Sequence, residues 1–150
     1  MAFTGNFMCT SFKQQLLEGA HDFRLTTGDV FYIALYTSSA SFTAATTAYT
    51  TSNEITNTSG SAYTAGGKSL TNISPTTSST TAYTDFADAT WSSASFTARG
   101  AMIYNSTPTH TYTNPSIVIL DFGSDKTASA GDFTVVFPTA DASNAIIRIA

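Results

Sequence analysis

Short runs of β-branched and aromatic residues, separated by turn-forming residues, are the feature that most constrains the fold of this chain. They span residues 30–36, 96–104, 117–122, 133–137 and 146–149. Each run is bounded by Gly, Pro, Asn, Asp or Ser. This pattern is typical of strands in an antiparallel sheet. We therefore expect a mainly β fold.

The spacing of the runs predicts an antiparallel β-sandwich, jelly-roll or Ig-like, formed by six or more strands. Residues 9–150 are expected to form this single domain. Residues 108–115 and the Gly- and Ser-containing stretch 123–131 are predicted to be loops, the second joining two strands as a hairpin. Residues 38–82 are rich in Ser and Thr, with regularly spaced apolar residues. We interpret them as long surface loops and edge strands, a flexible linker being the alternative.

One short N-terminal helix is predicted to open with residues 10–14. Ser11 and Gln14 have the spacing of a capping box, in which each side chain binds the backbone N–H of the other residue. Phe12, Leu16 and Ala20 recur four residues apart, so this face should pack on the sheet. Gly19 offers a left-handed end to the helix.

Few of the side chains are charged. Nearly a third of the 150 residues are Ser or Thr, the charged share is 11%, and the net charge is −4. A typical globular chain has about 25% charged residues. A surface coated with hydroxyl groups can be buried against another protein without stranding ions, so the composition indicates assembly, an ordinary monomer being the alternative. The six basic residues are scattered singly, which argues against nucleic-acid binding.

No stretch approaches the ~20 apolar residues of a membrane span. Residues 1–6 lack the basic and apolar regions of a signal peptide. We therefore expect a soluble chain that is made in a cytosol and has no membrane partner.

Residues with catalytic or metal-binding potential are sparse and dispersed. His21 and His110 are the two histidines, Cys9 is the single cysteine, and no phosphate-binding loop or nucleophile elbow occurs. Zinc sites and catalytic triads need several such side chains together. We expect no enzyme activity, no cofactor and no metal.

Arg99 lies in the middle of a predicted strand, among apolar neighbours. An unpaired ion would be costly there. We predict a structural ion pair with Asp85, Asp88 or Asp121.

Several strings of residues resemble a known family. They include 10–14 (TSFKQ), 35–40 (LYTSSA), 63–67 (YTAGG), 85–91 (DFADATW), 97–105 (TARGAMIYN), 120–123 (LDFG) and 146–150 (IIRIA). As a set, from about residue 9 to the end, they resemble short structural proteins encoded by tailed bacteriophages. The resemblance implies a non-enzymatic virion protein that is assembled in the host cytoplasm.

Among virion roles we favour a capsid decoration or cement protein, which would form homo-oligomers and bind the major capsid protein or other virion proteins. Such proteins act through many weak contacts that add by multivalency. Residues 1–8 would form an N-terminal arm whose Phe3, Phe7 and Met8 could dock on a neighbour.

The alternative is a tail, fibre or head-spike component, including an adhesin for host-surface glycans. Four tyrosines in polar segments could then stack on sugars, because a tyrosine ring pairs an apolar face with a polar tip. They are Tyr49, Tyr63, Tyr83 and Tyr112. The same tyrosines could instead fill loop clusters or a subunit interface.

Overall fold

The fold is mainly β, with two antiparallel sheets and one short helix. A computed structural model describes residues 3–150. The helix is α1 (Thr10–Leu17). The strands are β1 (Phe7–Met8), β2 (Phe31–Tyr36), β3 (Lys68–Ser69), β4 (Asn72–Ser78), β5 (Thr81–Phe86), β6 (Ala89–Asn105), β7 (Ser116–Val135) and β8 (Ile147–Ile149).

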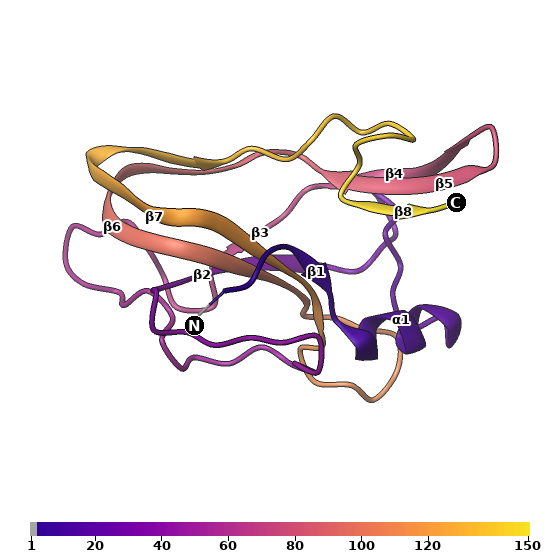
Figure 1. Cartoon of the computed structure of the whole chain (residues 1–150), viewed down its shortest axis with the longest axis horizontal. Helices are drawn as coiled ribbons and strands as arrows, with labels where there is room; N and C mark the ends of the chain where they lie inside the picture. Colours follow the sequence, from indigo (N-terminus) through magenta and orange to yellow (C-terminus); the bar gives the residue numbers. More distant parts are fainter. Residues whose placement is uncertain (1–2) are drawn as a thin grey trace.

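The larger sheet has the strand order β1-β7-β6-β2-β3, and the smaller has the order β4-β5-β8. In Figure 1 the small sheet lies above β1 and β2, level with the upper arm of the β6/β7 hairpin, and α1 lies below it at the same end. The mainly β class and the single helix are confirmed. The predicted strands at 30–36, 83–86 and 146–149 match β2, β5 and β8 closely.

Strands β6 and β7 form one long hairpin that turns back on itself. Ala98 pairs with Lys126 but Gly100 pairs with Asp121, so residues 122–125 of β7 lie opposite Arg99 alone. Such a bulge bends a strand sharply. Because of this bend, at the left of Figure 1, the molecule has two layers. The lower layer contains β1, β2, β3 and the lower arm of the hairpin, and the upper layer contains β4, β5, β8 and the upper arm.

The loop predicted at 123–131 is therefore wrong, because these residues lie within β7. Residues 126–129 pair with β6, and Gly131 pairs with Ala94. Their side chains are mostly exposed, so Ser, Thr and Ala are tolerated in this strand without an apolar pattern. The predicted loop at 108–115 does join the two strands.

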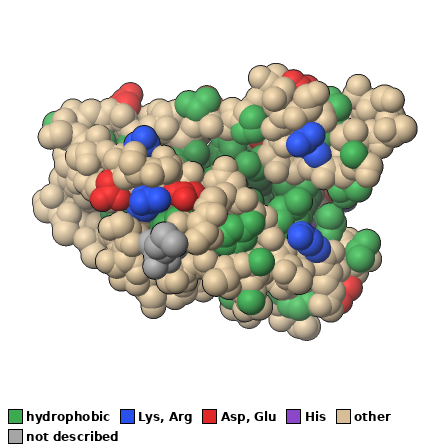
Figure 2. Space-filling view, viewed as in Figure 1, with side chains coloured by type: hydrophobic (Ala, Val, Ile, Leu, Met, Phe, Trp, Pro, Cys, Tyr) green, Lys and Arg blue, Asp and Glu red, His purple; other side chains and the backbone are tan. Residues whose placement is uncertain are grey.

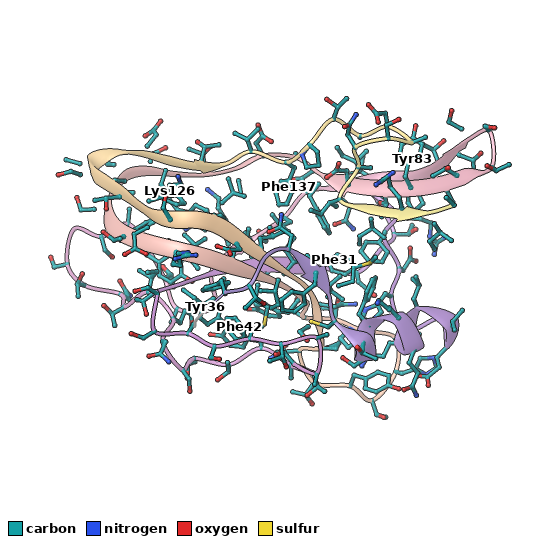
Figure 3. All side chains as sticks on the ribbon, viewed as in Figure 1. Phe31, Tyr36, Phe42, Tyr83, Lys126 and Phe137 are labelled. Atoms are coloured by element: carbon teal, nitrogen blue, oxygen red, sulfur yellow. The ribbon has the colours of Figure 1, made fainter. Side chains whose placement is uncertain are left out.

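The core between the layers is strongly aromatic (Figure 3). Phe31 stacks on Phe23 at 4.5 Å and lies 5.5 Å from Phe86, which in turn lies 5.8 Å from Phe137. Burial of such side chains contributes about 1.5–3 kcal/mol each. The helix covers one end of this core through its buried Phe12.

The capping box predicted for the helix does not form. Helix α1 begins at Thr10, so Cys9, and not Ser11, occupies the N-cap position. Ser11 lies inside the first turn, and within residues 3–150 its hydroxyl oxygen finds no hydrogen-bond partner. Gly19 adopts φ +72° just after the helix, as predicted. Gln15 is buried whereas Leu16 is only partly so.

The segment from residue 3 to residue 8 is part of the domain, which corrects the expectation of a free arm over 1–8. Phe3 is only 5% exposed and packs edge-on against Phe42 at 5.7 Å. Phe7 and Met8 pair with Ile119 and Val118 of β7. Residues 1 and 2 of the predicted arm lie outside the described residues.

Residues 37–67 form an irregular covering layer. Phe42, Ile55 and Tyr63 bury their side chains in the core, which fits the prediction of anchored loops over this range. The segment contains no strand among the described residues, apart from single bridges at Ala48 and Glu54. Edge strands follow only at β3 and β4.

Candidate functional site

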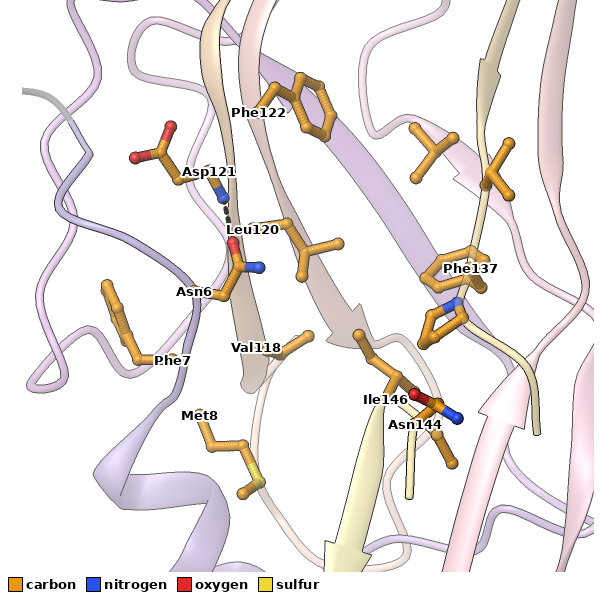
Figure 4. A pocket seen from close by; sticks show the side chains of 14 residues that line it. Asn6, Phe7, Met8, Val118, Leu120, Asp121, Phe122, Phe137, Asn144 and Ile146 are labelled. Carbon is orange, nitrogen blue, oxygen red and sulfur yellow. Dashed lines mark hydrogen bonds between the residues drawn. The ribbon is translucent and has the colours of Figure 1, made fainter. Parts of the chain in front are cut away.

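An open apolar groove separates the two layers on one side of the molecule. It encloses about 730 Å³. Val118 and Leu120 of β7 line one wall, and Phe137 and Ile146 line the other (Figure 4). Figure 2 shows hydrophobic side chains gathered in the hollow between the layers. The groove is therefore a concave surface that could receive an apolar partner.

A second cavity of about 390 Å³ continues the groove towards the bend of the hairpin. Phe122, Val135 and Val136 line both cavities. Val136 is 72% exposed, and among the large apolar side chains of the described residues only Leu17 is more exposed. Lys126 lies at the far end, inside the bend (Figure 3).

Two aspartates hold the wall formed by residues 136–146. Asp88 accepts the backbone N–H of Phe137 at 2.9 Å, and buried Asp85 accepts that of Ile146 at 3.2 Å. Burial raises the pKa of Asp85, and its hydrogen bonds to Phe86 and Ile146 partly offset this. Neither aspartate pairs with Arg99, so two of the three predicted partners serve the groove wall instead.

Arg99 pairs with the third predicted partner, Asp121, at 3.1 Å. The same carboxylate accepts the N–H of Gly123 at 2.8 Å and that of Gly5 at 3.2 Å. These hydrogen bonds and Arg99 hold the pKa of Asp121 below its usual range. Asp121 is the one charged residue among the described residues lining the 730 Å³ cavity. Its side chain points out of it (Figure 4), so the groove interior is essentially uncharged.

The edge of β7 beside the groove is open but protected. Within the described residues, β7 pairs with β1 only at Val118 and Ile119. Beyond that point the strand carries two irregularities, at residues 122–125 and at Ala130, which has φ +51°. Bulges and an inward-pointing lysine such as Lys126 are known devices that prevent pairing of open edges. The side chains of the groove, rather than this backbone edge, are thus the surface suited to a partner.

The four tyrosines predicted for glycan stacking do not form one platform. Tyr63 is 1% exposed, and its hydroxyl donates to Glu54 at 2.6 Å. Tyr49 also donates to Glu54, at 2.6 Å. Tyr83 borders an apolar cleft between α1 and the small sheet, whereas Tyr112 donates to Glu18 at the end of α1. Burial excludes Tyr63 from contact with a sugar.

The candidates for chemistry also lie apart. His21 is buried beneath α1, and His110 is exposed, its Nε2 lying 3.0 Å from the carbonyl oxygen of Glu18. Cys9 is fully buried, and burial raises the pKa of its thiol. Within residues 3–150 no group of three His, Cys, Asp or Glu side chains could hold a metal ion. In the same range no helix has the length and apolar character needed to cross a bilayer.

Sequence reasoning predicted that Phe7 and Met8 dock on a neighbour, and both line the groove. It missed the opposite wall. The alternation of residues 133–137 gives Val135 and Phe137 to the core and leaves Val136 outside. A valine facing outwards in a chain so rich in Ser and Thr was the available signal.

Comparison with known proteins adds no relative. No protein-family model matches the chain. Neither the curated proteins nor the solved structures contain a match.

Proposed function

We propose that this protein is a non-enzymatic structural protein of a bacteriophage virion, a capsid decoration or cement protein that acts as a homo-oligomer. The observation that carries the proposal is the uncharged groove with exposed Val136 on its rim. Burying this surface in an assembly would strand no ion, since the charge of Asp121 is paired with Arg99. The resemblance described above supplies the virion context.

We also propose that the two layers form a β-sandwich of the general kind that includes jelly-roll and Ig-like domains. The shared aromatic core and the hairpin that runs through both layers support this classification. A sandwich with one open side exposes interior-type side chains along that side, which is where Val135–Pro138 and Asn144–Ile146 lie.

The groove is proposed as the docking surface for the major capsid protein or a neighbouring virion protein. Val136→Asp places a charge on the rim at a site exposed enough to fold normally. We expect incorporation of this variant into particles to fall at least tenfold. Leu25→Asp is the matched control, since Leu25 is 57% exposed and does not line the groove. Equal incorporation of both variants would overturn the groove assignment.

The location in the virion is tested by labelling intact particles of the encoding phage with an antibody to this chain. Label spread over the head is expected for a decoration protein. Label confined to the tail or to one vertex would contradict this role and favour the fibre or adhesin alternative. Absence of label, together with absence of the chain from purified particles by mass spectrometry, would overturn the virion proposal altogether.

A further inference from the structure

A buried histidine connects α1 to the end of β6. His21 is 8% exposed. Its Nε2 lies 3.0 Å from Oε1 of Gln15, and its Nδ1 lies 3.0 Å from Nδ2 of Asn105. An amide oxygen accepts and an amide nitrogen donates, so the hydrogen of the imidazole belongs on Nε2. The connection therefore requires a neutral imidazole with a bare Nδ1.

The orientation of the Asn105 amide is fixed by two further contacts. Its Nδ2 also donates to a carboxylate oxygen of Asp29 at 2.7 Å, and its Oδ1 accepts the backbone N–H of Thr107 at 2.9 Å. A flip of this amide would direct its oxygen at the Asp29 carboxylate and leave the Thr107 N–H unpaired. Asn105 is itself fully buried, so leaving a buried donor unpaired there would destabilise the flipped amide.

The surroundings disfavour a charged imidazole. The rings of Phe12 and Phe23 lie 5.2 and 6.4 Å from it. Asp29 is the nearby carboxylate that favours the charged form, but burial outweighs it and lowers the pKa of His21 to about 4. Asp22 from the same segment pairs with Arg24. On the helix side Gln15 and Phe12 are uncharged, and Glu18 is exposed, as is His110 in the neighbouring loop.

We propose that His21 and Asn105 form a proton-operated latch that holds α1 and the segment following it against β6 only while His21 is neutral. A proton on Nδ1 would set two donors, the imidazole N–H and the Asn105 amide, against each other. Because the amide cannot turn, the contact must break, and the helix then loses this connection to β6, while the N-cap residue Cys9 still donates its N–H to the carbonyl oxygen of Ile117 in β7. The stability that this contact gives is complete above about pH 6.5 and is lost as the pH falls towards 4.

Hydrogen exchange of the intact chain at pH 6.5 and pH 4, corrected for intrinsic rates, tests the latch. We expect the amides of α1 to exchange at least tenfold faster at pH 4, while the paired centre of β6 and β7 keeps its protection. His21→Gln removes the titrating group, so its α1 amides should show the same protection at both pH values. His110→Gln is the control and should behave like the natural chain.

Direct titration of His21 by NMR keeps the proposal testable if His21→Gln fails to fold. We expect its midpoint to lie at least one pH unit below the ordinary value of a histidine, about 6.5. Two results would overturn the latch. One is a midpoint of His21 at that ordinary value. The other is protonation of His21 without any change in α1 protection.

Discussion

Glu54 is the residue whose contacts explain how an irregular segment is held on the sheet. It is 7% exposed, and its carboxylate accepts the hydroxyls of Tyr49 and Tyr63 and the N–H of Gly66. The Tyr63 hydroxyl in turn accepts the N–H of Leu35 in β2 at 3.0 Å. Burial and the neighbouring carboxylate raise the pKa of both tyrosines, so both hydroxyls remain donors.

Glu54→Gln tests this cluster at constant shape. The glutamine nitrogen would face one of the three donors, so a buried donor would lose its acceptor. We expect the free energy of unfolding to fall by about 1–3 kcal/mol, as measured by urea denaturation followed through the fluorescence of Trp91. Asp125→Asn, at an exposed position in β7, should change it by less than about 0.5 kcal/mol. Similar values for the two variants would show that the cluster adds no stability.

The polar neighbours of Tyr49 and Tyr63 are compatible with surface rings that stack on sugars or with rings that fill a loop cluster. The structure shows a loop cluster, because both hydroxyls donate to Glu54. No sequence pattern indicates that Glu54 contacts Tyr63, nine positions after it, or Tyr49, five positions before it. Arg99, by contrast, lies in an apolar run, where a charged side chain requires a counter-ion. The sequence therefore predicted an aspartate partner and offered three candidates. In the structure the partner is Asp121.

At the scale of elements, β1 and the residues before it decide whether the N-terminus can act independently. Phe3 is buried against Phe42, and a Cβ on Gly100 would lie 2.4 Å from the Phe3 ring, which shows how closely the ring covers the sheet. Asn6 accepts the N–H of Asp121 at 2.7 Å. The N-terminal segment is therefore a component of the larger sheet.

Phe3→Ala should destabilise the fold by about 3–5 kcal/mol, as other buried Phe→Ala changes do. Phe7→Ala is the matched change at a partly exposed position of the same segment, and we expect it to cost less than half as much. Thermal and urea unfolding of the two variants measure the difference. A loss of stability below about 1 kcal/mol for Phe3→Ala would instead support an N-terminal arm that does not pack on the domain.

Element boundaries were predictable where apolar residues alternate and unpredictable where pairing alone makes a strand. Strand β2 is buried along nearly its whole length, so its sequence had to be apolar. The stretch from Gly123 to Gly131 is exposed and belongs to β7 only because residues of β6 face it. The residues of β6 that pair with it lie some thirty positions away in the sequence, so the local composition does not predict the pairing.

At the scale of the whole molecule, stability comes from apolar packing far more than from charge. Arg24–Asp22 and Arg99–Asp121 are the two ion pairs among residues 3–150, and the Arg24 pair is largely exposed. Exposed pairs contribute about 0–1 kcal/mol each.

Ionic strength should therefore have little effect on stability near neutral pH. Raising NaCl from about 20 to 200 mM shortens the Debye length roughly threefold. We expect the free energy of unfolding to change by less than about 1 kcal/mol, as measured by parallel urea titrations. A change of several kcal/mol would reveal longer-range electrostatic stabilisation than these two pairs provide.

The bend in the β6/β7 hairpin also governs how the molecule must come apart. Since the same two strands run from one layer into the other, this hairpin alone joins the layers covalently at two points. A force that separates the layers has to straighten the bend. We therefore expect no species in which one layer stands folded while the other is lost, and a single cooperative transition for both.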